Sequence, residues 1–127
     1  MPSSRVLLVE DDPAIAMLLE EMLRDLGVVD VQVEGRLEGA LASARDGDFG
    51  CVILDLKLHG KETFEVARVL EERRIPFAFF TGYGVDSLKE YAQFPVLPKP
   101  FAESDLQQVV RSLMNGGSAG VQGGPAG

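Results

Sequence analysis

The chain has 127 residues and a formal net charge of −8, with 46% hydrophobic and 25% charged residues. This length suits one domain with a buried core, and the acidic balance argues against binding to nucleic acid or to an anionic membrane. The longest apolar runs are too short to span a bilayer, and acids at positions 10–12 interrupt any signal-peptide pattern. The single cysteine, Cys51, lacks an internal disulfide partner, so we expect a cytoplasmic protein in which Cys51 packs as a small apolar residue.

The first predicted elements are a strand and a helix. Val6–Val9 is apolar throughout, which predicts a strand buried on both faces. Asp12 and Pro13 then predict a helix N-cap followed by proline at the first helical position. Gly27 is expected to end this helix in a left-handed conformation. The apolar residues expected on its buried face recur at helical spacing: Ile15, Leu18, Met22 and Leu26.

The remaining segments repeat this alternation. Valines alternate with polar residues over 29–34, which predicts a half-buried strand at a sheet edge. The later predictions are helices at 37–44, 64–70 and 106–113, a short, weak helix at 85–92, apolar strands at 52–54 and 77–80, and a brief edge strand at 96–97 between two prolines.

Strand and helix thus alternate five times, which predicts an α/β fold with a parallel sheet and helices on both of its faces. Three strands are apolar throughout and belong in the middle of the sheet, so the other two lie at its edges. The strand order 2-1-3-4-5, a flavodoxin-like (βα)5 arrangement, satisfies this condition. We expect residues 1–115 to form the domain and the glycine-rich residues 116–127 to form a flexible tail.

In such a sheet, ligands bind at the carboxyl ends of the strands. Polar side chains follow four of the predicted strands: Glu10, Asp11 and Asp12 after the first, Asp55 after the third, Thr81 after the fourth and Lys99 after the fifth. Crowded carboxylates repel one another, and a Mg²⁺ ion relieves this repulsion. We expect Asp11 and Asp55 to bind the ion directly and Glu10 to bind it through water.

Asp55 is also a candidate nucleophile for phosphoryl transfer. A phosphoryl group needs its charge neutralised, which the metal, Lys99 and the Thr81 hydroxyl would do. Each residue alone has a plainer interpretation, such as a helix cap for Asp12 or Asp11, a strand-end hydroxyl for Thr81 or a solvated side chain for Lys99. Their joint placement favours a phosphoacceptor site.

Four segments in this order, 6–12, 52–55, 81–82 and 98–101, resemble the receiver domain of bacterial two-component response regulators. The resemblance implies that Asp55 takes a phosphoryl group from a sensor histidine kinase or a phosphotransfer protein. It implies a Mg²⁺ site at Asp11, Asp55 and the backbone carbonyl of Lys57, with Glu10 in the acidic pocket. It also implies that Thr81 and Lys99 contact the phosphoryl group, and that the bond between Lys99 and Pro100 is cis.

Some positions depart from the receiver pattern. Val96 stands where most receivers have an aromatic switch residue, and the nearby Phe94 is out of register. His59 replaces the usual proline four residues after the phosphoacceptor, and we expect its side chain to be exposed. No ring at position 96 can rotate into the core, so a different element has to report phosphorylation.

The segment 76–84 resembles a subgroup of single-domain regulators from alphaproteobacteria, whose motif begins Phe-Ala-Thr-Gly. Phe80 stands at the alanine of this motif. We hypothesise that Tyr83 and its loop replace the missing aromatic switch, with Gly82 and Gly84 giving the loop freedom. Tyr83 and Lys57 flank the acceptor and are expected to tune hydrolysis of the phosphoryl group.

The sequence therefore predicts a single-domain response regulator that switches partner binding and is not an enzyme acting on external substrates. A phosphate sink, a phosphorelay intermediate and a degenerate receiver used for docking remain open. Haloacid-dehalogenase-type phosphatases need an acid two residues after the nucleophile, where Lys57 stands. Nucleotide-binding turns need glycines after the first strand, where three acids stand.

Overall fold

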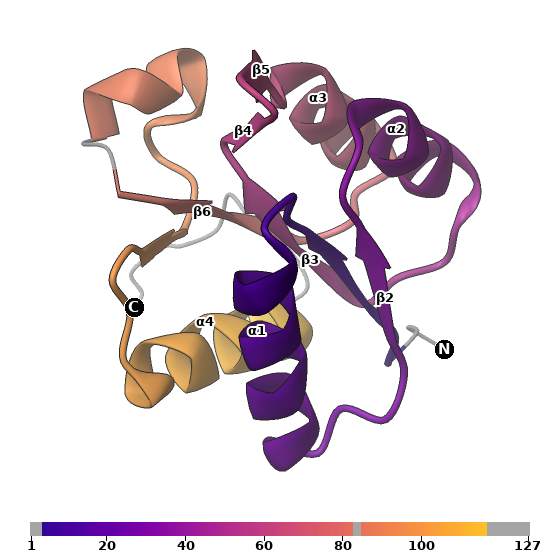
Figure 1. The fold of residues 1–127 in the computed structure, drawn as a ribbon. Helices are drawn as coiled ribbons and strands as arrows, with labels where there is room; N and C mark the ends of the chain where they lie inside the picture. The colour runs from indigo at the N-terminus through magenta and orange to yellow at the C-terminus, as the bar shows by residue number, and fades with distance from the viewer. Residues whose placement is uncertain (1–3, 83–84, 117–127) are drawn as a thin grey trace.

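A five-stranded parallel sheet with the order β2-β1-β3-β6-β7 forms the centre of the molecule (Figure 1). The structure is a computed structural model that describes residues 4–82 and 85–116. Its elements are β1 (Val6–Val9), α1 (Pro13–Asp25), β2 (Val31–Glu34), α2 (Leu37–Asp46), β3 (Cys51–Asp55), β4 (Lys57–Leu58), β5 (Lys61–Glu62), α3 (Phe64–Glu72), β6 (Phe77–Thr81), the 3₁₀ segment η1 (Val85–Tyr91), β7 (Val96–Pro98) and α4 (Glu103–Gly116).

Strands β4 and β5 form a separate two-stranded hairpin, so β6 and β7 are the fourth and fifth strands of the main sheet. The predicted strand order 2-1-3-4-5 is therefore confirmed. The central strands β1, β3 and β6 are buried at every position, whereas β2 and β7 at the edges are only partly buried. Strands that are apolar throughout thus lie in the middle, because helices cover both of their faces.

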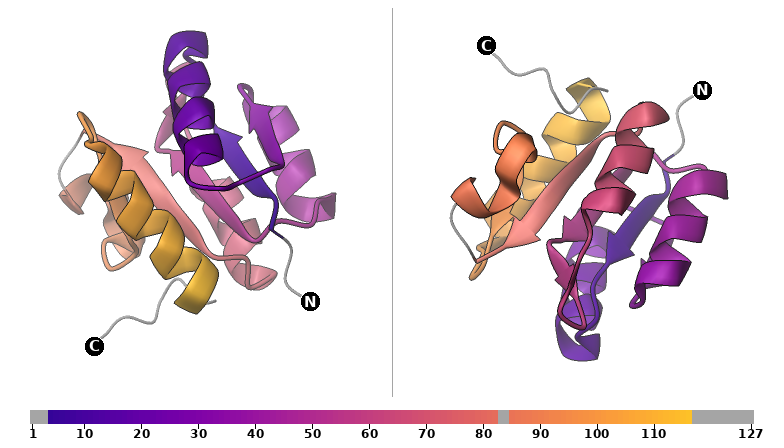
Figure 2. Two further views of the ribbon diagram at one scale, coloured as in Figure 1. Left: turned by 90° about the horizontal axis from the view of Figure 1, so that it is seen from below. Right: turned by 90° about the horizontal axis from the view of Figure 1, so that it is seen from above.

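Helices α1 and α4 cover one face of the sheet, and α2, α3 and η1 cover the other (Figure 2). Alternate residues of each strand enter the two cores, so that Phe77 and Phe79 face α2 and α3 while Phe80 faces α1 and α4. Cys51 is fully buried on the α1 and α4 side, and this burial raises the pKa of its thiol to about 12. Burying each such phenylalanine contributes about 1.5–3 kcal/mol.

Helix α1 begins and ends where the sequence predicts, but its buried face is different. The Asp12 carboxylate accepts hydrogen bonds from the N–H groups of Ala14 and Ile15 at 2.9 and 3.4 Å, and Gly27 has a φ of 102°. The prediction that Leu18 faces the core is wrong, because its side chain is 49% exposed. The buried face consists of Ala16, Leu19 and Leu23, flanked by partly buried Ile15, Met22 and Leu26.

The predicted alternation in β2 is also wrong. Val29 lies outside the strand and is 83% exposed, and Val33 is 39% exposed. Gln32 and Glu34 are half-buried because they bond to α2 or to each other: the Ser43 hydroxyl donates to Glu34 at 2.8 Å, and the Gln32 amide donates to both Glu34 and Ser43. An edge strand that finds polar partners on a neighbouring helix does not have to bury its valines.

The structure also contains a hairpin that the sequence analysis did not predict. Strands β4 and β5 pair antiparallel around His59 and Gly60, which have φ values of 50° and 81°. Positive φ at both central residues is typical of a type I′ turn. The weak helix predicted at 85–92 is a 3₁₀ segment interrupted at Lys89.

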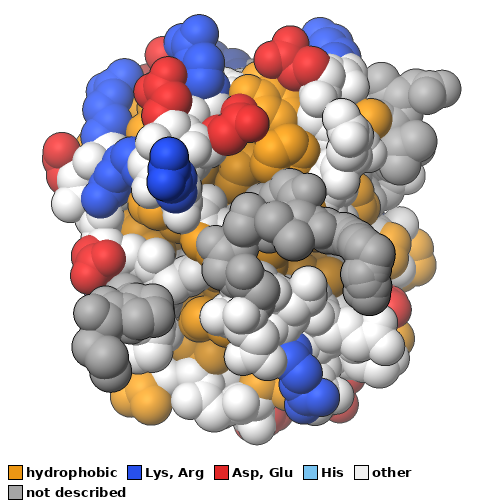
Figure 3. Space-filling view, turned by 180° about the vertical axis from the view of Figure 1, so that it is seen from behind, with side chains coloured by type: hydrophobic (Ala, Val, Ile, Leu, Met, Phe, Trp, Pro, Cys, Tyr) orange, Lys and Arg blue, Asp and Glu red, His pale blue; other side chains and the backbone are white. Residues whose placement is uncertain are grey.

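Two predictions concern parts of the chain at or beyond the described ranges. The prediction that the tail begins at Gly116 is wrong by one residue, because Gly116 is the last residue of α4. Residues 117–127 of the predicted tail lie outside the described ranges, as does Tyr83. In residues 4–82 and 85–116, no helix is long and apolar enough to cross a membrane. On the described part of the face in Figure 3, Lys and Arg side chains are interspersed with Asp and Glu rather than gathered into one basic patch.

Candidate functional site

The carboxyl ends of β1, β3, β6 and β7 bring five polar residues to one rim of the sheet: Glu10, Asp11, Asp55, Thr81 and Lys99. Asp55 is the last residue of β3 and Thr81 the last residue of β6. Both are buried, as is Glu10, with exposed fractions of 6%, 3% and 3%. The fold thus assembles a polar group at the switch point, where neighbouring loops diverge.

Lys99 connects the last strand to the acidic residues. Its ammonium Nζ lies 3.2 Å from Asp55 Oδ2 and 3.7 Å from Glu10 Oε1. Its backbone N–H donates to the Thr81 carbonyl at 3.1 Å, and its bond to Pro100 is cis, as the resemblance implied. The main chain of Lys99 is therefore anchored next to β6 while its side chain neutralises part of the acidic charge.

The acidic group has the composition of a Mg²⁺ site. Glu10, Asp11 and Asp55 each offer a carboxylate oxygen, and these three atoms lie within 4.8 Å of one another. Opposite ligands in a Mg²⁺ octahedron are separated by about 4.2 Å, so the carboxylates need little movement. Glu10 Oε1 is buried and has no hydrogen-bond partner among the described residues. These donors fit a hard divalent cation.

The pKa of Glu10 is shifted because its carboxyl is buried close to that of Asp55. Burial raises the pKa of its carboxyl to about 7; the hydrogen bond from the Asp12 N–H opposes this rise, and the nearby Asp55 adds to it. A raised pKa is the expected response of a buried acid beside a second carboxylate. A cation bound between them favours the ionised form.

Asp11 is held by the β4–β5 hairpin. The backbone N–H of His59 donates to Asp11 Oδ2 at 2.7 Å, and the imidazole Nδ1 lies 3.7 Å from the same oxygen. Burial acts to raise the pKa of Asp11, but the hydrogen bond from His59 and the interaction with Glu10 outweigh it and lower the pKa. The His59 side chain is 66% exposed, as predicted, and its contact with Asp11 was missed. The dipeptide His59-Gly60 was the available signal, since glycine there suits a tight turn.

Thr63 is a second residue that the sequence analysis missed. Its side chain is fully buried, and its hydroxyl donates to the backbone carbonyl of Asp55 at 2.6 Å and lies 3.1 Å from that of Leu56. The Thr63 N–H also donates to Leu56, at 3.0 Å. The main chain that carries Asp55 is thereby fixed from the start of α3.

Thr63→Val is expected to lower the free energy of unfolding by about 1–3 kcal/mol, because it removes a buried donor without changing the shape of the side chain. Urea unfolding followed by circular dichroism measures this loss. Thr63→Ser keeps the hydroxyl and is the matched control. Equal stability of the serine and valine variants would contradict the role of the hydrogen bond.

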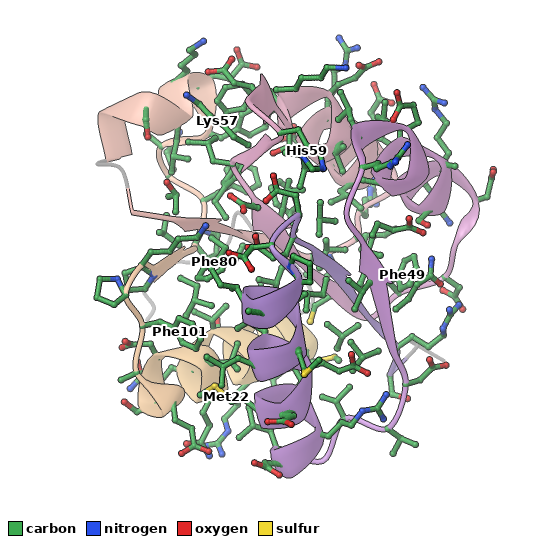
Figure 4. All side chains as sticks on the ribbon, in the orientation of Figure 1. Met22, Phe49, Lys57, His59, Phe80 and Phe101 are labelled. Atoms are coloured by element: carbon green, nitrogen blue, oxygen red, sulfur yellow. The ribbon has the colours of Figure 1, made fainter. Side chains whose placement is uncertain are left out.

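Lys57 and Val96 were also predicted to take part in the site, Lys57 through its backbone carbonyl and Val96 at the switch position. Lys57, the first residue of β4, donates its N–H to Asp55 Oδ1 at 3.3 Å. Figure 4 shows Lys57 and His59 on the hairpin side of the sheet and Phe80 on the side of α1 and α4. Val96 in β7 pairs with Phe79 and is half-buried against the core.

A family model for the response regulator receiver domain matches residues 6–111. The chain belongs to this family. Receiver domains are the phosphoacceptor modules of two-component systems, and they accept phosphoryl groups from histidine kinases or phosphotransfer proteins.

Individual receivers resemble the chain over most of its length. SdrG from Sphingomonas melonis is 38% identical and matches with a TM-score of 0.76 over 88% of this chain and 98% of SdrG. The receiver domain of the Pseudomonas aeruginosa sensor histidine kinase PA1611, solved with magnesium in its active-site cleft, is 25% identical with a TM-score of 0.76, covering 87% and 97% of the two chains. TcrA, a transcriptional regulatory protein from Mycobacterium tuberculosis, is 32% identical over 120 residues; the match covers 89% of this chain, which spans about half the length of TcrA.

Val96 packs against a core cluster that is rich in aromatic side chains. Phe94 stacks on Phe77 with ring centroids 5.0 Å apart, and it lies 5.4 Å from the ring of Tyr91. Tyr91 in turn stacks on Phe64 at 5.8 Å, and the next residue back from Phe64 is the Thr63 that bonds to Asp55. Tyr91 of η1 and Phe94, which follows it, are part of this aromatic cluster.

Proposed function

We propose that this receiver is a phosphorylation-controlled switch whose acceptor is Asp55. The observation that carries the proposal is the 3.2 Å contact between Lys99 Nζ and Asp55 Oδ2 beside two further carboxylates. A carboxylate that merely ends a strand needs neither a cation nor neighbouring acids. A carboxylate that has to receive a phosphoryl group needs both a fixed cation and a metal site.

In the proposed reaction a carboxylate oxygen of Asp55 attacks the phosphorus of a phosphohistidine. The P–N bond breaks as the O–P bond of an acyl phosphate forms, and the leaving imidazole takes up a proton. Lys99 pairs with one oxygen of the transferred group and the Thr81 hydroxyl donates to another. Asp55 thus changes from an acceptor of the Lys99 contact into the carrier of a larger negative charge.

Mg²⁺ would be held by Asp11, Asp55 and the backbone carbonyl of Lys57, with Glu10 acting through water. When bound, it neutralises charge on the phosphoryl oxygens. The buried Glu10 oxygen that accepts no hydrogen bond within the described residues and the magnesium in the related PA1611 receiver support this assignment. Phosphorylation would then alter binding to another protein, and Val96, Tyr83 and Lys57 would set how the change is reported and how long it lasts.

The proposal includes a stand-alone, cytoplasmic receiver of residues 1–115, followed by Gly116, which ends α4, and by a tail formed by the residues after it. The match that spans 98% of SdrG supports the first part, and the buried free thiol of Cys51 supports a reducing compartment. An immunoblot of the native cells checks the size. A band near 13.7 kDa agrees with the proposal, and a band about twice as large contradicts it.

Incubation with acetyl phosphate and Mg²⁺, followed by intact-mass measurement, tests the acceptor function. We expect one added phosphoryl group. Chelation of the metal with EDTA is expected to slow the addition about a hundredfold or more, because metal stabilisation of phosphoryl charge is worth several kcal/mol. Restoring Mg²⁺ in excess over the chelator is the control. No adduct with Mg²⁺ present would indicate a receiver used only for docking, and an unchanged rate in EDTA would contradict the metal role.

A further inference from the structure

Phe80 lies in β6, between strand β3, which ends in Asp55, and strand β7, which leads to Lys99. In the parallel register, Asp55 of β3 pairs with Phe80 of β6, and Phe80 pairs with Leu97 of β7. Register partners in neighbouring strands point to the same face, and residues two apart along a strand do so too. Asp55, Phe80 and Lys99 therefore share the face that α1 and α4 cover.

Lys99 can reach Asp55 only by crossing over β6. Neighbouring strands lie about 4.8 Å apart, so the path from β7 to β3 is roughly 10 Å long. The residue of β6 beneath this path is Phe80. The Lys99 ammonium lies 4.4 Å from the centroid of the Phe80 ring while it contacts Asp55 Oδ2 at 3.2 Å.

The ring is fixed in this position. Phe80 is 1% exposed and belongs to the core on the α1 and α4 side. Phe101 packs edge-on against it, with ring centroids 5.5 Å apart and an interplanar angle of 80° (Figure 4). The Lys99 ammonium lies over the face of this ring, and a ring face carries the negative part of the aromatic quadrupole.

We propose that Phe80 is a positioning residue that holds the Lys99 ammonium in place for phosphoryl transfer. The carboxylates of Asp55 and Glu10 attract the ammonium from one side, and the ring attracts it from another. An aliphatic side chain at position 80 fills the same space without that attraction. The lysine side chain, which is 30% exposed, would then spend more time in solvent. The catalytic part of this inference rests on the proposed acceptor function of Asp55.

Two replacements at position 80 separate the attraction of the ring for the Lys99 ammonium from the packing of the ring in the core. Site-specific incorporation of 3,4,5-trifluorophenylalanine keeps the ring and its packing but withdraws electron density from its face. Phe80→Leu removes the ring. We expect the rate of phosphorylation by acetyl phosphate at saturating Mg²⁺ to fall about threefold for the fluorinated ring and about tenfold for leucine, in line with a partly desolvated cation–π contact.

The matched control is the same pair of replacements at Phe77, which is fully buried on the opposite face of the sheet and packs against Phe79 and Phe94. These variants are expected to lose stability in urea unfolding but to retain the phosphorylation rate. Equal rates for wild type and the fluorinated Phe80 protein would overturn the inference. So would equal slowing by the replacements at Phe77, because the effect would then belong to the fold and not to the ring beneath Lys99.

NMR gives a readout that does not depend on phosphorylation. Protons above a ring face are shielded, so the Lys99 Hε resonances of the wild type are expected upfield of those of Lys61 and to return to ordinary positions in Phe80→Leu. Lys99 Hε resonances that do not differ between the two proteins would overturn the inference. Failure of the wild type to accept a phosphoryl group would refute the proposed function, and the chemical shifts would still decide whether Phe80 holds Lys99.

Discussion

Asp55→Asn is expected to abolish phosphoryl addition from acetyl phosphate and from any phosphohistidine donor. The amide has nearly the shape of the carboxylate, and its oxygen still accepts the hydrogen bond from the Lys57 N–H that lies 3.3 Å from Asp55 Oδ1. It lacks the negative charge and the lone-pair reactivity that attack on phosphorus requires. The fold is therefore retained while the reaction is lost, and intact mass after incubation with Mg²⁺ measures the loss.

Asp46→Asn is the matched control for this prediction. Asp46 is an exposed acid at the end of α2, so its amide variant should gain one phosphoryl group as the wild type does. Retention of the adduct in Asp55→Asn would move the acceptor to another residue, and Asp11 and Glu10 would be the first to test. The same variant should also bring the pKa of Glu10 closer to its ordinary value, because the Asp55 charge contributes to its rise to about 7.

The order of the strands could be predicted because it depends on composition. Strands covered on both faces have to be apolar at every position, so β1, β3 and β6 were distinguishable from the edges. The buried face of α1 was not distinguishable in this way. A stripe defined by large apolar residues selected Leu18, whereas the helix lies against the sheet through Ala16 and Leu19. A small residue at the contact permits close approach, and hydrophobicity alone does not reveal it.

The convergence of the site could be predicted because all parallel strands end at the same rim. The hydrogen bonds that the main chain makes around the site could not be predicted from the sequence. The hydrogen bond from the His59 N–H to Asp11 depends on a left-handed turn, and the bond from Thr63 depends on where the Asp55 carbonyl points. The contact between Phe80 and Lys99 depends on the register of β6 against both neighbours, which no short motif encodes.

Lys99→Met is expected to slow phosphorylation by about a hundredfold to a thousandfold, the range seen when one preorganised donor to a developing negative charge is removed. Methionine has a similar length and no charge, so the packing over Phe80 is largely retained. Removing the ammonium 3.2 Å from Asp55 and 3.7 Å from Glu10 also leaves the carboxylates with one cation fewer. Rates at several acetyl phosphate concentrations measure the first effect, and calorimetric titration with Mg²⁺ measures the second.

The two effects of Lys99→Met have opposite signs, and this separates the role of the lysine from that of the metal. Because Lys99 and Mg²⁺ neutralise the same acids, loss of the lysine should tighten Mg²⁺ binding while the phosphorylation rate falls. Lys61→Met, at an exposed lysine of the β4–β5 hairpin, should change neither quantity appreciably. A slow Lys99→Met protein that also binds Mg²⁺ more weakly would mean that the lysine supports the metal site. A fast one would remove Lys99 from the reaction, because the group that contacts Asp55 before transfer would then contribute nothing to the transfer itself.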